Sequence, residues 1–155
     1  MSNELNIEVM VTNGAKEAVE SSDIVVTATR SAVPIVEGHW INPGLHINSI
    51  GADCPMKSEL HASVFKRADK LVIDCQQALE SADIRILFEQ GILKPENVYA
   101  SIGEIVAGVK AGREDKSEIT IFKSVGTTLP YVTICAKIYE KAVKEDLGTQ
   151  ISSLL

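Results

Sequence analysis

Four strand-like segments, separated by stretches of helical and turn character, constrain the fold of this chain most. They read DIVVTAT (23–29), LHINSIG (45–51), KLVIDC (70–75) and EITIFKSVG (118–126). The first is a continuous apolar run, which is typical of a strand covered on both faces. Because strands alternate with helices, we predict an α/β fold built on a mainly parallel sheet with right-handed crossovers.

The segments between these strands supply the predicted helices and one further β-rich run. A helix over 58–68 takes Ser58 as its N-cap, and 76–91 forms one helix or two short ones, ended by Gly91. The longest predicted helix, 127–146, carries apolar residues at helical spacing. The remaining segments are the β-rich run NIEVMV (6–11) and two short helices, within 13–22 and 101–112.

Length, charge and cysteine usage narrow the class of protein. The 155 residues suit one domain, and a formal net charge of −6 disfavours nucleic acid or an acidic membrane as a partner. No apolar run approaches the roughly 20 residues of a membrane span, and the N-terminus does not read as a signal peptide. The three cysteines have no paired spacing, which indicates a reducing cytoplasm rather than a disulfide framework.

Three polar turns follow predicted strands, and they suggest where a ligand binds. They are TATRS (27–31), GADCPMK (51–57) and KSVGTT (123–128). In a parallel sheet these turns share one edge, and ligands of such sheets lie outside the carboxyl ends of the strands. Convergence of three turns is stronger evidence for a site than any one turn alone.

Asp53, in the second turn, has two interpretations. It is a helix cap or turn-forming residue beside Pro55, or it is a general acid/base at a strand end. Desolvation would raise the pKa of its carboxyl, whereas Lys57 would lower it, so the sequence leaves the direction open. The neighbouring Cys54 has no evident base to make it a nucleophile.

Other sites have weaker support. The histidines show no ligand spacing, so we predict no metal site, and GxGxxG does not occur. His46 lies within a predicted strand and is interpreted as a hydrogen-bonded structural residue, and Cys75 and Cys135 are interpreted as core residues. SVGT (124–127) precedes a helix whose first amides suit an anion, although its spacing favours an ordinary strand-to-helix turn.

Taken together, these segments resemble the ornithine cyclodeaminase and mu-crystallin family. The matching pieces are AVESSDIVVTATRS, HINSIG followed by ADCPMKSEL, VIDCQQALESADI and ITIFKSVG, in that order. The resemblance runs from about residue 15 to about residue 142 and corresponds to the C-terminal half of the family. It implies a Rossmann-type parallel sheet with flanking helices that binds NAD or NADP.

The chemistry implied by the resemblance is hydride transfer at the α-carbon of a small amino or imino acid. Members include ornithine cyclodeaminases, alanine dehydrogenases and ketimine or pyrroline-carboxylate reductases. Asp53 matches the family's proton donor/acceptor, which also contacts cofactor and substrate, and Val125 matches a substrate contact. The further positions that match cofactor contacts are Thr27, Ile50, Gly51, Ala52, Lys57 and Ser124.

The resemblance also implies what this chain lacks. Residues 1–126 would form a partial dinucleotide-binding domain without its first strand and glycine-rich turn, and 127–155 would form a C-terminal helix that packs back on the substrate domain in full-length relatives. We therefore expect little activity from the chain alone, and a homo-oligomer or a complementing N-terminal half as its partner. The alternative is a non-enzymatic, mu-crystallin-like binding module or half of a split protein.

Overall fold

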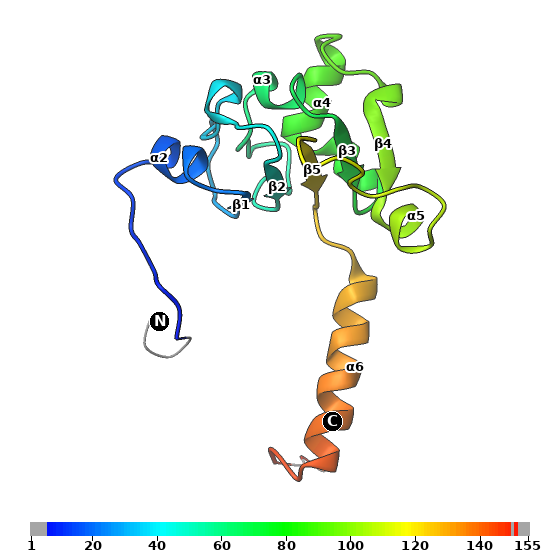
Figure 1. Ribbon diagram of the computed structural model, residues 1–155. Coiled ribbons are helices and arrows are strands. Elements are labelled where there is room, and N and C mark those ends of the chain that lie inside the picture. The colour runs from blue at the N-terminus through cyan, green and yellow to red at the C-terminus, as the bar shows by residue number, and fades with distance from the viewer. Residues whose placement is uncertain (1–5, 150, 152–155) are drawn as a thin grey trace.

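The computed structural model describes residues 6–149 and 151, and five parallel strands form its centre (Figure 1). Their order across the sheet is β1-β2-β5-β3-β4, with all four pairings parallel. The strands are β1 (Ile24–Thr27), β2 (His46–Ser49), β3 (Lys70–Ile73), β4 (Val98–Ser101) and β5 (Thr120–Lys123). The predicted α/β class with a parallel sheet and flanking helices is confirmed.

Short helices connect the strands, and one long helix follows the last strand. The α-helices are α2 (Ala15–Glu20), α3 (Ala62–Phe65), α4 (Ala82–Glu89), α5 (Ile102–Val106) and α6 (Thr128–Lys144). Three 3-10 turns complete the connections: η1 (Gly38–Trp40), η2 (Gln76–Glu80) and η3 (Pro95–Asn97). The predicted 76–91 pattern is therefore two short helices, with Gly91 following in a left-handed conformation (φ +65°).

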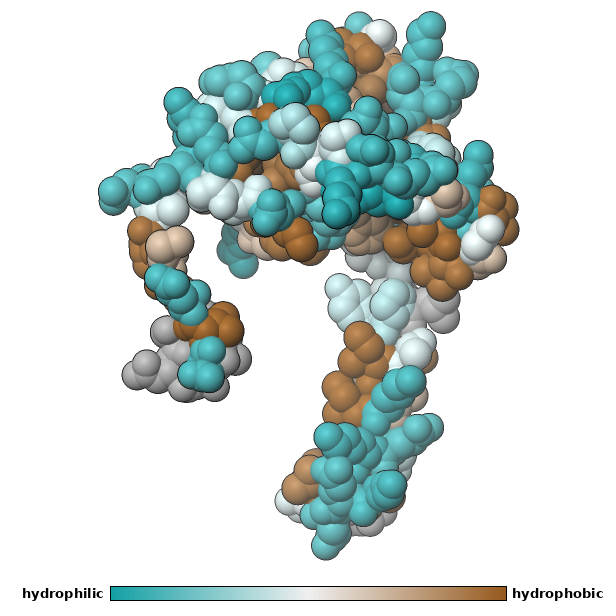
Figure 2. Space-filling model, in the orientation of Figure 1, coloured by the Kyte–Doolittle hydropathy of each residue, from teal (hydrophilic) through white to brown (hydrophobic). Residues whose placement is uncertain are grey.

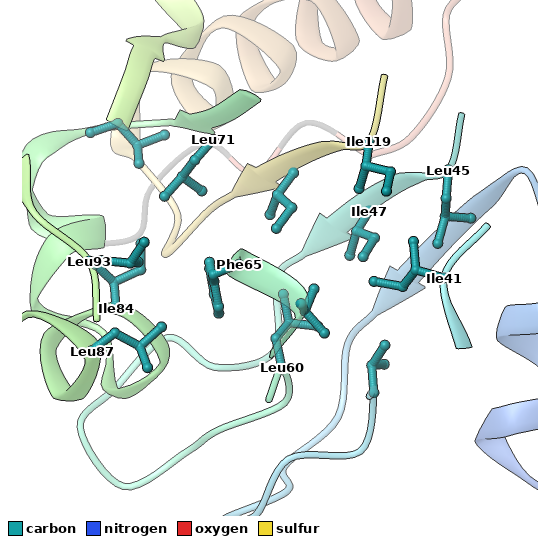
Figure 3. Close-up of a cluster of buried hydrophobic side chains, with 14 of the residues drawn as sticks. Ile41, Leu45, Ile47, Leu60, Phe65, Leu71, Ile84, Leu87, Leu93 and Ile119 are labelled. Atoms are coloured by element: carbon teal, nitrogen blue, oxygen red, sulfur yellow. The ribbon is translucent and has the colours of Figure 1, made fainter. Parts of the chain in front are cut away.

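One face of the sheet, the covered face, holds the core. It presents Ile47 and Leu71, which are buried in one cluster with side chains of α3 and α4 (Figure 3). Ile121 is in register with both and belongs to the same cluster. These helices lie in connections that step across the sheet in one direction, and right-handed crossovers place such connections on the same face. The core is thus built from one side of the sheet.

The opposite face, the open face, is only partly covered. It begins on β1 with Ile24 and Val26, whose exposed fractions are 63% and 58%. Toward β3 and β4 it is shielded by α5, where Ile102 and Ile105 line a groove with Phe122 and other strand residues. The prediction that 23–29 is covered on both faces is therefore wrong for this chain, because no described element packs over β1 on this side.

Three local predictions also differ from the structure. Residues 6–11 form no strand, because no neighbouring strand in the described part of the chain pairs with them. The helix predicted over 58–68 is only α3, capped by His61, whose Nδ1 accepts from the Ser63 amide. Ser58 instead donates to Asp83 (2.8 Å). The strand β4 was not predicted, since its sequence VYAS has no extended apolar run.

The helix α6 leaves the sheet after β5 and projects away from it (Figure 1). Its apolar side chains form a hydrophobic surface (Figure 2), and the exposed ones include Val132, Ile134, Ile138, Tyr139 and Val143. Cys135 on this helix is exposed, so its assignment to the core is wrong. No helix in the described residues is both long and apolar enough to span a bilayer.

Candidate functional site

Three strand ends lie side by side at the carboxyl edge of the sheet. Thr27 is in register with Ser49, and Ser49 with Lys123. Beyond the strands, the amides of Ile50 and Gly51 both donate to the Thr27 carbonyl (2.9 and 3.0 Å), and the Ser124 amide donates to the Ser49 carbonyl (3.0 Å). The predicted convergence of the three turns is confirmed.

Asp53 stands on the central turn with its side chain 48% exposed. Its Oδ1 accepts a hydrogen bond from Lys57 Nζ at 2.6 Å. This hydrogen bond outweighs the opposing effect of desolvation and lowers the pKa of Asp53, while the same contact raises the pKa of Lys57. Asp53 is consequently ionised near neutral pH, which suits a group that accepts a proton.

The neighbours of Asp53 differ in what they present to the surface. Ile50 is exposed, whereas Thr27 and Ala52 are buried. Gly51 has no room for a side chain, because a Cβ there would collide with the backbone of Thr29 and with the Glu59 carboxylate. Gly51 is therefore required by the packing of the 27–29 turn, in addition to the close cofactor approach that the sequence suggested.

The third turn is organised by Asp74, at the end of β3. One carboxylate oxygen, Oδ2, accepts from the Ser124 hydroxyl (2.7 Å) and from the amides of Val125 and Gly126 (3.0 and 2.9 Å). Gly126 is in a left-handed conformation (φ +84°), which lets the chain reverse into α6. Ser124 and Val125 are thus held at the same edge as Asp53, and Ser124 with Tyr131 of α6 lines a groove there.

Sequence reasoning missed four charged residues around these turns. Asp74 fixes the third turn, and Glu59, Asp83 and Lys123 are buried beside the second. Their one sequence signal is charge in an apolar context, such as the lysine in ITIFK. A buried charge demands partners, but the partners lie too far along the chain for a local pattern to identify them.

The histidines and cysteines contribute little to this edge. His46 lies on the open face, where its Nδ1 contacts Thr120 Oγ1 at 2.7 Å, so the structural interpretation of His46 is confirmed. Burial raises the pKa of the Cys75 thiol, which disfavours a reactive thiolate there. Within the described residues, no group of three or more His, Cys, Asp or Glu side chains is placed to hold a metal ion.

The residues present fit the nicotinamide end of a dinucleotide better than its phosphate end. The carboxyl edge brings together an ionised carboxylate, an exposed Ile50 and the Ser124 turn. The glycine-rich sequence that cradles a pyrophosphate does not occur in the chain. Thr27, Lys57 and Val125 lie on the same three turns, so the structure brings together all the positions that the sequence singled out.

Comparison with known proteins gives consistent matches over almost the whole chain. Residues 1–146 match the family described as ornithine cyclodeaminase/mu-crystallin. The alanine dehydrogenase of Archaeoglobus fulgidus is 40% identical over 135 residues, which are 87% of this chain and 42% of that protein. The chain spans less than half the length of this curated relative.

Solved structures agree with these sequence matches. The Δ1-pyrroline-2-carboxylate reductase of Thermococcus litoralis, in complex with NADH and L-proline, superposes with a TM-score of 0.90 at 41% identity, covering 97% of this chain and 47% of that one. An archaeal alanine dehydrogenase dimer with bound NAD gives a TM-score of 0.85 at 38% identity, covering 99% of this chain and 47% of that one.

Proposed function

Because the chain belongs to the ornithine cyclodeaminase/mu-crystallin family, we propose that it carries the proton-transfer half of an NAD(P)-dependent amino- or imino-acid active site. The observation that supports this most is the position of Asp53. Its carboxylate is ionised, half exposed and paired with Lys57 at the edge where the 27–29 and 124–126 turns meet. Relatives of similar sequence are described as dehydrogenases and reductases of small amino and imino acids.

The chemistry divides between cofactor and protein. When bound, the nicotinamide supplies or accepts the hydride at the α-carbon. Oxidation of an amine to an imine also releases a proton from nitrogen, and Asp53 in its ionised form accepts it. In the reductive direction Asp53 returns that proton to the nitrogen. Lys57, at 2.6 Å, keeps the carboxylate in its basic form between these steps.

Thr27, Ile50, Gly51, Ala52, Lys57 and Ser124 are our proposed cofactor contacts, and Val125 is a proposed substrate contact. Ala52 is fully buried, backbone included, so a direct contact at this position requires the turn to shift when the cofactor binds. The proposed cofactor is NAD or NADP. The unpaired cysteines fit a reducing cytoplasm.

We further propose that the open face, the outer edge of β1 and α6 pack against the substrate domain and the first strands of a complete nucleotide fold, within a homo-oligomer. The same polypeptide or a complementing N-terminal half supplies these regions. Solvent-exposed Ile24, Val26 and Ile138 support an interface of this kind.

The test is turnover with and without the Asp53 carboxylate. The chain would be purified alone and after co-expression with the N-terminal half of Archaeoglobus fulgidus alanine dehydrogenase. NADH oxidation would be followed with Δ1-pyrroline-2-carboxylate and with pyruvate plus ammonia. Asp53→Asn should lower turnover by at least about 100-fold with little change in NADH affinity measured by nicotinamide fluorescence.

Asp23→Asn is the matched control, because Asp23 lies at the amino edge of the sheet, before β1. It should change turnover by less than about twofold. Near-normal turnover in Asp53→Asn would remove Asp53 from the proposed role. Saturable NADH binding without turnover on any substrate would favour the binding module instead.

A further inference from the structure

A fully buried ammonium group lies directly beneath the Asp53 turn. Lys123, at the end of β5, donates from Nζ to the Ala52 carbonyl (2.7 Å), to Ser49 Oγ (3.2 Å) and to Asp83 Oδ2 (3.2 Å). A lysine has three N–H donors, and all three have partners here. The side chains of Lys123 and Asp83 are both completely inaccessible to solvent.

Asp83 extends this contact to the far end of the same turn. It lies in the first turn of α4, and its Oδ1 accepts from the Ser58 hydroxyl (2.8 Å) and from the Glu59 amide (2.9 Å). The Lys123–Asp83 pair is therefore hydrogen-bonded to the chain at Ala52, just before Asp53, and again at Ser58 and Glu59.

Glu59 is a second buried charge that is hydrogen-bonded to these turns. Its Oε1 accepts from the amide and the hydroxyl of Thr29 (2.5 and 2.7 Å), and its Oε2 accepts from the Gly51 amide (3.0 Å). Like Lys123, it is fully buried. This carboxylate joins the first turn of the carboxyl edge to the second, two residues before Asp53.

A need for stability alone does not explain these charges. Buried ion pairs can often be replaced by apolar residues of similar size without loss of stability. Apolar side chains, however, form no hydrogen bonds to backbone groups, and here the bonded backbone groups include the Gly51 amide, the Ala52 carbonyl and the Glu59 amide. Asp53, between them, is half exposed and bonded to a partly exposed lysine.

We propose that Lys123, Asp83 and Glu59 are positioning residues that fix the backbone on both sides of Asp53 and so aim its carboxylate at the reacting nitrogen. This inference rests on the proposed function for its purpose, but its structural content is testable without turnover. A frame of buried charges beneath an exposed acid holds that acid within the narrow range of positions that proton transfer requires.

The test compares amide hydrogen exchange of the wild-type chain with that of the Lys123→Met/Asp83→Asn double variant. Removing both charges together leaves neither member of the Lys123–Asp83 pair without its partner, and the asparagine keeps an oxygen for the Glu59 amide. The Ala52 carbonyl nevertheless loses its donor. We expect a near-wild-type midpoint of urea unfolding, with exchange over residues 50–57 faster by about tenfold or more and exchange over β4 unchanged.

Lys70→Met is the matched control, since Lys70 is a largely buried strand lysine paired with Glu114 (2.6 Å) and Glu118 (3.2 Å) at the amino end of β3. It should leave exchange over 50–57 unchanged. Wild-type exchange over 50–57 in a folded double variant would overturn the proposal. If the double variant does not fold, Glu59→Gln replaces it, with faster exchange at the Gly51 amide expected and an unchanged rate overturning the inference.

Turnover then separates this inference from the proposed function. In the assay that tests Asp53, the double variant should lower kcat by about tenfold or more while KM for NADH stays near wild type. Near-wild-type stability with wild-type kcat in the double variant would reduce the three residues to a structural role and overturn the proposal. The double variant could show faster exchange while Asp53→Asn shows normal turnover. That result would reject the proposed function of Asp53, but the finding that the buried charges fix the backbone of its turn would stand.

Discussion

Apolar side chains on the two faces of the sheet lie in very different surroundings. On the covered face, Ile47 and Ile121 are completely buried beneath α3, α4 and η1. On the open face, Ile24 and Val26 of β1 are mostly exposed although they belong to an equally apolar strand. The difference follows from topology, because the crossovers that step from β1 toward β4 all lie on one side.

This asymmetry separates the core, which stabilises the described chain, from the exposed apolar surface, which is available to a partner. The covered face contains the core and also the buried charges that fix the Asp53 turn. The part of the open face over β1, the edge of β1 and α6 expose apolar side chains with no described neighbour over them. Contiguous apolar surface of this kind is typical of an interface.

The largest expected effect comes from making the same substitution on each face. Ile121→Ala should lower the free energy of unfolding by about 2–5 kcal/mol, because it leaves a cavity in a site with no exposed surface. Ile24→Ala, at 63% exposure, should cost about 0.5 kcal/mol. Urea titrations followed by circular dichroism measure both, and equal losses would show that the open face is buried in solution.

A smaller effect is expected from the buried Glu59. Burial raises the pKa of this carboxyl, but the hydrogen bonds from Thr29 and Gly51 together overcome burial and lower it below its ordinary value of 4.5. A carboxyl whose pKa is lower in the folded chain than in the unfolded chain stabilises the fold at any pH above its unfolded-state pKa. This stabilisation is lost as the pH falls through its folded-state pKa. Glu59→Gln should therefore cost about 1–3 kcal/mol at pH 7 and flatten the loss of stability below pH 4.5.

The control for this pH dependence is Glu89→Gln, a similar change at an exposed position on α4. Unfolding midpoints would be compared at several pH values between neutrality and acid. Glu89→Gln should retain the wild-type pH profile. An unchanged pH profile in Glu59→Gln would mean that protonation of this carboxylate does not affect folding. The hydrogen bonds from Thr29 and Gly51 would then contribute no pH-dependent stability.

The comparison also indicates which features a sequence can reveal. The strands β1, β2, β3 and β5 were predictable, because each follows from a local run of residues. Residues 6–11 have equally favourable β composition, yet they form no strand because a strand needs a partner. The strand β4 forms without a strong local signal because β3 provides an edge beside it.

The candidate site shows the same division. Asp53 and the turns around it follow from parallel topology, which places strand ends at one edge. The buried network beneath them does not follow from local sequence, because Asp83 and Lys123 are 40 residues apart and Asp74 and Val125 are 51 apart. The direction of the Asp53 pKa shift also required the observed contact with Lys57.

The smallest effect on stability is expected on α6. Ile138→Ser removes an apolar side chain that is 62% exposed, so the free energy of unfolding should change by no more than about 0.5 kcal/mol. If α6 is an interface, the same substitution should weaken association of the chain with itself or with an N-terminal half, measured by analytical ultracentrifugation. Lys137→Ser, on the neighbouring exposed position, is the control and should leave association unchanged. A large loss of stability in Ile138→Ser would instead indicate that α6 packs against the sheet in solution. The helix would then not belong to the proposed interface.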